Sequence, residues 1–289
     1  MKRISASLGV VVLTATCLIA CNPQTRVLVA GDSWAYIMEL LRTFENPFVY
    51  NVVYMADMGD TAEYWNRFRD WEVRDLLEAN EDIDIVVLSL GGNDLMYRGS
   101  IHQTEEEKAA LIDEIAGHLE GVVDNVLWVR SDVKIALLSY DYPNWDESME
   151  WPLSWEYYHY DYESIGSPES AIQVNTYVQR LGREKWRIAD ERDRVVFVNN
   201  YGLMQWKYGY GKYGIPPGSL PHPGYSPEGP VFGGDPEYYS PPMGMLSVPH
   251  LYCDAYHLSP GGYIQIMGNA MERCIEDWLY DGGGVGREN

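Results

Sequence analysis

The stretch "VLVAGDSWAYIMELL", residues 27–41, indicates the class of fold. An apolar run ends at Gly31, Asp32 and Ser33, and a helical pattern begins at once. A buried strand that leads directly into a helix is the repeating unit of α/β proteins. Asp and Ser are both favoured helix N-caps, so this stretch alone leaves Ser33 as either a cap or a nucleophile. Residues elsewhere in the chain distinguish the two.

The same alternation continues through the chain. Short apolar runs predict strands at 26–30, 48–55, 83–90, 133–140 and 194–200. Helical patterns fall between and after them, at 34–44, 61–79, 104–125, 168–190 and 259–280. Nearly continuous apolar strands that alternate with helices are typical of a parallel sheet covered on both faces. We therefore expect an α/β fold with a five-stranded parallel sheet, in one domain over residues 26–280.

Two segments interrupt the alternation. Residues 141–167 are aromatic and acidic, and residues 201–250 are rich in Gly, Pro and Tyr. Loops of this length are usually functional or disordered, and the many aromatic residues favour ordered, packed loops. Ligands of open α/β sheets bind beyond the carboxyl ends of the strands. Ser33, the "GGND" run at 91–94 and both loop insertions all follow strands, so we expect the site at that edge.

A serine hydroxyl is a weak nucleophile that needs a base nearby. Of the six histidines, His257 lies in "DAYH", where Asp254 precedes it by three residues. Such a carboxylate can bind the imidazole Nδ1–H, fix the tautomer and stabilise the imidazolium. The spacing predicts an acid–base pair just before the last helix. A metal site formed by His250, Asp254 and His257 is an alternative that the spacing permits, but it leaves Ser33 unexplained.

Acyl transfer also needs hydrogen-bond donors for the developing oxyanion. Asn93 offers a side-chain amide directly after a buried strand. Gly59, after the second strand, offers a backbone N–H, and Ser33 offers its own at a helix start. We expect these three donors to form the oxyanion hole, although Gly59 is equally well explained as a loop glycine.

Together these blocks resemble the SGNH (GDSL-type) hydrolase family. The resemblance rests on Gly31-Asp32-Ser33, on Gly59, on Gly91-Gly92-Asn93-Asp94 and on Asp254-x-x-His257, in the family's order. It implies a three-layer, flavodoxin-like fold and serine ester hydrolysis without a metal or organic cofactor. It assigns Ser33 as nucleophile, His257 as base and Asp254 as orienting acid. Trp34, where the family name has Leu, is read as a change in packing.

Other known patterns do not fit their surroundings. The glycines at 209, 211 and 214 match a dinucleotide fingerprint, but Pro216 and Pro217 prevent a helix there. The chain has no G-x-S-x-G motif, so an α/β-hydrolase assignment lacks its main signature. The formal charge of −22 argues against nucleic acid as a partner and against charge-driven binding to an anionic membrane.

The first residues are typical of an export signal. Lys2 and Arg3 precede an apolar run that ends at Ala20-Cys21. This end resembles the lipobox of bacterial lipoproteins, which implies that residues 1–20 are removed and that Cys21 is lipidated. An ordinary signal peptide and an uncleaved anchor are the alternatives. We expect a protein of the bacterial cell envelope, with residues 21–25 as a tether and residues 281–289 as a flexible tail.

Cys253 and Cys274 are the cysteines that remain after removal of the signal and lipidation of Cys21. In an oxidising compartment such a pair is a candidate disulfide, and two buried thiols are the alternative. The bond would attach the acid–base loop to the last helix.

The predicted function is therefore a lipid-anchored serine esterase or acylhydrolase that acts on a small-molecule or glycan-linked ester. Acyl transfer to a glycan and a catalytically silent binding lipoprotein remain alternatives. The tether of residues 22–25 spans at most about 14 Å, which keeps the start of the first strand near the membrane. We therefore expect the site to face away from the anchoring leaflet.

Overall fold

A computed structural model describes residues 25–43, 50–148, 150, 170–248 and 252–281. Residues 1–24, with the signal, Cys21 and most of the tether, lie outside the described residues, as do most of the 141–167 segment, His250 and the tail. The expectations that concern them stay predictions. No helix in the described ranges is both long enough and apolar enough to cross a membrane.

A five-stranded parallel sheet forms the centre of the molecule, as the sequence predicted. Its order is β2-β1-β3-β4-β5. The strands are β1 (Thr25–Gly31), β2 (Tyr50–Ala56), β3 (Ile83–Ser89), β4 (Lys134–Leu138) and β5 (Val195–Val198). β2 lies on one side of β1, and the later strands β3, β4 and β5 lie on the other. The strand order therefore reverses at the β1/β3 boundary, which is the switch point where ligands bind in such sheets.

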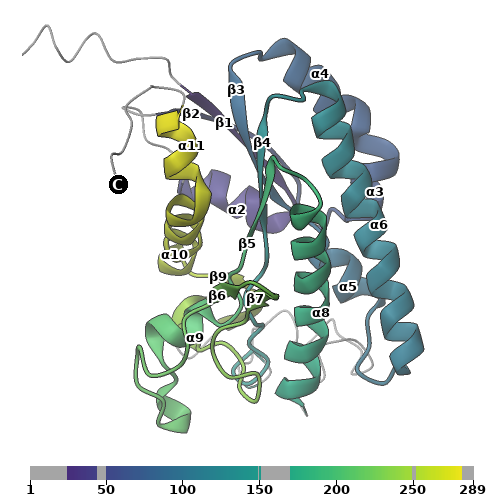
Figure 1. Ribbon diagram of the computed structural model, residues 1–289. Coiled ribbons are helices and arrows are strands. Elements are labelled where there is room, and N and C mark those ends of the chain that lie inside the picture. Colours follow the sequence, from purple (N-terminus) through teal and green to yellow (C-terminus); the bar gives the residue numbers. More distant parts are fainter. Residues whose placement is uncertain (1–24, 44–49, 149, 151–169, 249–251, 282–289) are drawn as a thin grey trace, which may run out of the picture.

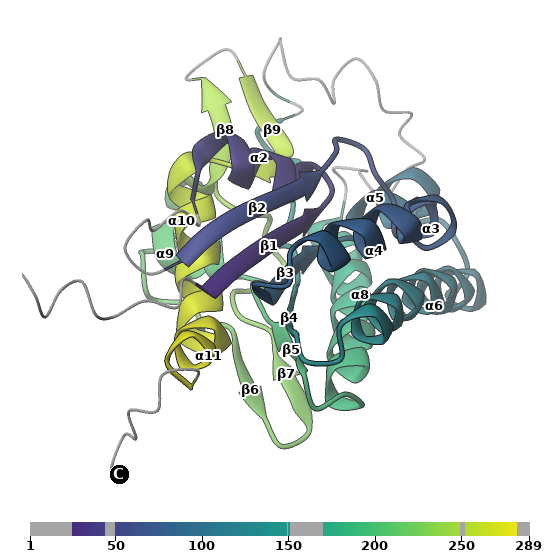
Figure 2. The ribbon, with the colours of Figure 1, turned by 90° about the horizontal axis from the view of Figure 1, so that it is seen from above.

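Helices cover both faces of this sheet (Figures 1 and 2). On β1, Leu28 and Ala30 face one core, while Val27 and Val29 face the other. The first core is closed by α3 (Ala62–Tyr64), η1 (Trp65–Arg69), α4 (Asp70–Ala79), α6 (Glu105–Val129) and α8 (Ala171–Asp190). The second is closed by α2 (Ser33–Leu41), α9 (Leu203–Tyr208), α10 (Pro260–Ala270), η4 (Met271–Ile275) and α11 (Glu276–Asp281). The three layers follow from apolar residues on both faces of each strand.

Several elements were not expected from the sequence, among them α9, which lies inside the second loop insertion. The helix α5 (Gly92–Arg98) begins inside the "GGND" run, and two antiparallel hairpins fall in the second loop insertion and after it. One hairpin pairs β6 (Gly224–Ser226) with β7 (Gly229–Val231), and the other pairs β8 (Met245–Val248) with β9 (Tyr252–Leu258). Short 3-10 turns at η2 (Gly211–Tyr213) and η3 (Pro242–Gly244) complete the described elements. Asp254 and His257 thus lie on a strand, β9.

The described parts of the loop insertions pack into the protein. Tyr142, Trp145, Tyr201 and Tyr239 are almost completely buried. The amide of Gln205 on α9 donates to the carbonyls of residues 235, 238 and 239, which attaches this later part of the insertion to α9. Many of the loop aromatics therefore belong to the scaffold rather than to a binding surface.

The expected disulfide is not formed. Cys253 on β9 and Cys274 on η4 are both buried thiols. The Cys274 thiol donates to the carbonyl of Ala270 over 3.6 Å, and burial raises its pKa well above the usual value. Both side chains lie in the apolar core between the sheet and α10, where a thiol packs as a small hydrophobic group. The prediction of a disulfide was therefore wrong. Each thiol is stabilised by packing among apolar side chains and is not bonded to the other.

Candidate active site

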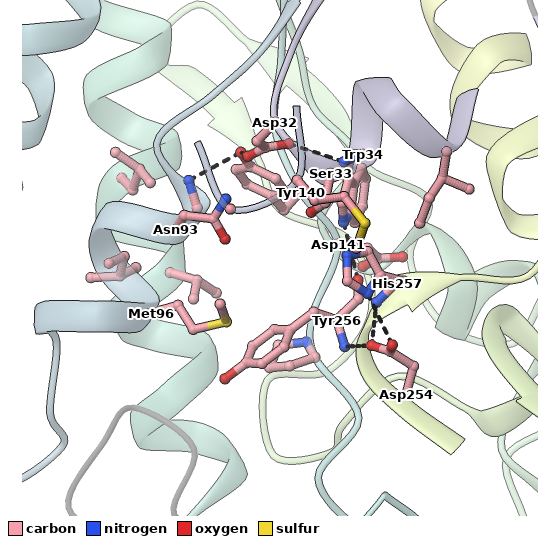
Figure 3. Close-up of a pocket in the computed structure, with 18 of the residues that line it drawn as sticks. Asp32, Ser33, Trp34, Asn93, Met96, Tyr140, Asp141, Asp254, Tyr256 and His257 are labelled. Carbon is pink, nitrogen blue, oxygen red and sulfur yellow. Dashed lines mark hydrogen bonds and ion pairs between the residues drawn. The ribbon is translucent and has the colours of Figure 1, made fainter. Parts of the chain in front are cut away.

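A cavity of about 840 Å³ lies beyond the carboxyl ends of β1, β3 and β4. Its size is that of a small-molecule site. Ser33, Gly59, Asn93, Asp254 and His257 all line it, although they come from four separate parts of the chain. Figure 3 shows Asn93 on one side of the open space, with Ser33 and His257 on the other.

The turn that carries Ser33 is held tightly against β3. Gly31 has a φ of +145°, and a Cβ there would lie 1.9 Å from the carbonyl oxygen of Ser89. Only glycine fits this approach. The Asp32 carboxylate caps α2 by accepting from the N–H of Trp34 at 3.1 Å. Asp32 is therefore the cap, and Ser33 is the first helical residue, with its N–H at the positive end of the helix dipole.

Asp254 holds both the ring and the backbone of His257. One carboxylate oxygen lies 2.9 Å from the imidazole Nδ1. The other accepts from the N–H groups of Tyr256 and His257, both at 2.7 Å. This arrangement selects the tautomer with the proton on Nδ1 and leaves Nε2 as the ring nitrogen that can take a proton.

A hydrogen bond joins Asn93 to the turn that carries Gly59. The Asn93 amide donates to the carbonyl of Asp60 at 2.8 Å, which places it beside Gly59. The next residue, Asp94, accepts from the N–H groups of Ala62 and Glu63 at 2.7 and 3.1 Å. Gly59 has a φ of +82°, which favours glycine at this turn.

Tyr140 is a site residue that sequence reasoning missed. Its hydroxyl donates to the Asp32 carboxylate and accepts from the N–H of Gly92 at 3.0 Å. One side chain therefore joins the turn of Ser33 to the turn of Asn93. Tyr140 lies two residues after the end of β4, at the same edge as the other candidates, and this position was the available signal.

Behind Tyr140 lies a fully buried lysine. The Lys185 Nζ donates to the carbonyl of Leu138 at 2.8 Å and stands 4.5 Å from the centre of the Tyr140 ring. Burial lowers the pKa of Lys185 and raises that of Asp32, while the opposite charges of the two groups counteract both shifts. On α8, Lys185 falls on the same stripe as Leu181 and Ile188, so the sequence could have revealed a lysine on an apolar face.

Trp34 has a larger role than the packing change that was expected. It is buried, and its ring meets Tyr140 and Tyr263 edge to face. Its indole N–H also donates to the carbonyl of Tyr256 at 3.1 Å. The residue after Ser33 therefore binds the backbone next to His257 and connects α2 with β9.

One group in the described residues has the spacing of metal ligands: Glu63, Glu114 and His118 offer atoms within 4.8 Å of one another. Arg67 pairs with Glu63, and Arg98 binds both oxygens of Glu114. None of the three acidic or imidazole groups lines the cavity. In the alternative metal site, Asp254 and His257 are joined by their own hydrogen bond, and His250 lies outside the described residues.

The architecture is that of an α/β protein, and the cavity that Ser33 lines lies at the switch point of its sheet. The family model of the GDSL-like lipases and acylhydrolases matches residues 27–270, so the chain belongs to this family of ester-bond hydrolases. No curated protein matches the sequence.

Solved structures share the fold. A Streptococcus pneumonia protein with the provisional name platelet activating factor has a TM-score of 0.51 at 17% identity, over 96% of this chain and 100% of its own. A Clostridium thermocellum family 3 carbohydrate esterase has a TM-score of 0.44 at 16% identity, over 90% and 100%. The catalytic domain of a Streptococcus pneumoniae peptidoglycan O-acetyltransferase has a TM-score of 0.44 at 8% identity, over 88% and 94%.

Proposed function

We propose that this protein is a lipid-anchored serine esterase that uses Ser33, His257 and Asp254 as its catalytic triad. The observation that carries the proposal is the bond from Asp254 to the His257 Nδ1, at a cavity that Ser33 and Asn93 also line. A base oriented by a carboxylate, a hydroxyl at a helix start and an amide donor are the parts that acyl transfer needs.

In this mechanism the Ser33 Oγ attacks the ester carbonyl carbon while His257 Nε2 takes the hydroxyl proton. Asp254 stabilises the imidazolium that results. The tetrahedral oxyanion accepts hydrogen bonds from the Asn93 amide and from the backbone N–H groups of Ser33 and Gly59. His257 then protonates the leaving alcohol, and a water molecule, activated by the same base, releases the acid from Ser33.

The membrane anchor is part of the proposal. Cys21 would carry the lipid, and the few residues before β1 would hold the amino end of that strand near the membrane. The two ends of β1 lie at opposite ends of the sheet (Figure 1). Ser33 follows the carboxyl end of this strand, so the cavity that it lines would open away from the anchoring leaflet. An acyl transferase would use the same site with a sugar hydroxyl in place of water, and product analysis for free acid against transferred acyl group separates the two.

Replacement of the nucleophile tests the triad. In Ser33→Ala, the hydrolysis of aryl esters should fall by at least about a thousandfold, because no other group can form the acyl-enzyme. Fluorophosphonate labelling should disappear with it. The exposed loop serine in Ser219→Ala gives the matched control, with rate and labelling unchanged. Activity of Ser33→Ala near that of the wild type would exclude the assignment.

A further inference from the structure

One wall of the cavity is apolar throughout. It is formed by Leu95 and Met96 of α5 and by Val174, Val178 and Leu181 of α8, and we call these five residues the α5–α8 wall. Positions 174, 178 and 181 repeat at helical spacing, so they share one face of α8. The charged and imidazole groups that line the cavity in the described residues are Asp32, Asp141, Asp254 and His257, and all stand outside this wall.

The wall has a partly exposed part and a buried part, and we call the buried part its floor. Val174, Leu181 and Leu95 are 0%, 1% and 3% exposed, whereas Met96 and Val178 are half-buried. At the rim, Met58 and Tyr97 are largely exposed. A ligand that enters past this rim would leave water as it moves toward the floor, and the side chains of the wall offer it no polar partner.

These surroundings discriminate between two kinds of substrate group. A sugar hydroxyl that reached the floor would lose its hydrogen bonds to water without replacement. The Tyr201 hydroxyl, which is also at the cavity, already donates to the carbonyl of Val178 at 2.8 Å. An alkyl chain gains from the same burial, by about three- to fourfold in affinity for each methylene group.

We propose that the α5–α8 wall binds the acyl chain of the substrate and that the preferred chains are much longer than acetyl. This inference rests on the proposed function, because the chain is placed by the ester carbonyl between Ser33 and Asn93. Asn93 precedes Leu95 and Met96 on α5, so a chain that leaves the carbonyl beside Asn93 meets the wall at once (Figure 3). The cavity volume of about 840 Å³ is far larger than an acetyl group requires.

A series of p-nitrophenyl esters, from acetate through butanoate, hexanoate and octanoate to decanoate, tests the chain length on the full-length enzyme. The wild-type kcat/KM should rise from acetate to an optimum at a longer chain, by roughly three- to fourfold for each methylene buried. A profile that is highest for acetate and falls with every added carbon would overturn the inference.

Val178 is the best position for variants, because it lies in the wall and is only half-buried. Val178→Phe should shift the optimum to shorter chains, so that the ratio of kcat/KM for octanoate to kcat/KM for acetate falls by about tenfold or more. Val178→Ala should shift the optimum toward longer chains. The control Ile172→Phe adds the same ring to α8 at an exposed position outside the cavity and should leave the profile unchanged. An equal loss on all esters in Val178→Phe would contradict the role of the wall.

Binding to Ser33→Ala separates this inference from the triad. Octanoate should raise the Tm of Ser33→Ala much more than acetate at equal concentration, and Val178→Phe in the same background should remove that difference. If Ser33→Ala still hydrolyses esters, the triad is wrong. If hydrolysis depends on Ser33 but octanoate and acetate shift the Tm equally, the triad stands and the acyl-binding role of the α5–α8 wall is wrong.

Discussion

At the scale of single residues, the site is held together by hydrogen bonds between turns that are far apart in sequence. Tyr140 joins Asp32 to Gly92, Asn93 binds the carbonyl of Asp60, and Trp34 binds the carbonyl of Tyr256. Each bond connects one turn of the site to the next. The distances between the proposed nucleophile, oxyanion donors and base therefore depend also on Tyr140 and Trp34, which have no direct part in the proposed chemistry.

Tyr140→Phe tests this dependence. It leaves the Gly92 N–H and one Asp32 oxygen without their partner in a buried place, at a cost on the order of 1–3 kcal/mol. If Tyr140 acts as a positioning residue, kcat should fall by about tenfold or more while KM changes little, because the donors would be misplaced mainly for the transition state. Steady-state kinetics with one ester measures this split.

Tyr142→Phe is the matched control. Tyr142 is more deeply buried than Tyr140. Its hydroxyl donates to the carbonyl of Gly233 at 3.1 Å and accepts from the amide of Gln179, and these bonds join no part of the site. Both variants should lower the Tm by a similar amount, whereas only Tyr140→Phe should lower kcat. If the two lose kcat to the same extent, the effect of Tyr140 is one of general stability.

At the scale of elements, the sequence predicted the five strands because they are apolar on both faces. A continuous apolar run can be identified in the sequence without knowing which strand it pairs with. It did not predict α5 or β9. The helix α5 has only 7 residues and begins with glycine, which gives no capping signal. Residues 252–258 become a strand because they pair with β8, and such pairing depends on distant residues.

The candidate site follows the same division. Ser33, Asn93, Asp254 and His257 could be proposed from motifs because the chemistry requires those residue types in that order. Tyr140 and Lys185 could not, since their meaning arises only when β4 and α8 bring them behind Asp32. The disulfide was predicted from the oxidising compartment and from the number of remaining cysteines alone. Neither carries information on how the side chains of Cys253 and Cys274 pack.

Asp141 lies just after β4, at the start of the first loop insertion, and its titration gives a test by pH. The Asp141 carboxylate accepts from the N–H groups of Tyr142, Gly202 and Met204, and burial raises its pKa to about 7. Because this pKa lies above that of an unfolded aspartate, the folded state takes up the proton first as the pH falls. Its contribution to stability should therefore increase from about pH 7 down to about pH 5, by roughly 1–3 kcal/mol.

Asp141→Asn removes that titration. The difference in unfolding free energy between wild type and variant, measured by urea denaturation across this pH range, should grow in favour of the wild type as the pH is lowered. A difference that is constant, or that shrinks on acidification, would mean that the three N–H donors keep Asp141 charged at all these pH values.

At the scale of the whole molecule, charge and anchor have separate roles. A formal charge of −22 gives the surface no attraction to an anionic membrane, so membrane attachment would depend on the lipid at Cys21. β1 has 7 residues, which places its carboxyl end about 20 Å from its amino end, and Ser33 lies beyond that. The proposed enzyme would thus be held by one end of the sheet and would work at the other.

This arrangement predicts which esters the anchored enzyme can reach. Cys21→Ser should move the protein from the membrane fraction to the soluble fraction with kcat/KM on a soluble octanoate ester unchanged. The lipidated wild type on phosphatidylcholine vesicles should hydrolyse that soluble ester at the same rate. It should release little fatty acid from the vesicle that carries it, because a site some 20 Å or more from the tethered end does not meet the anchoring leaflet. Fatty acid release from the carrier vesicle at a rate comparable to soluble ester hydrolysis would show that the cavity faces the membrane instead. Cys253→Ser, which leaves the lipid site intact, controls for the loss of a thiol and should remain in the membrane fraction.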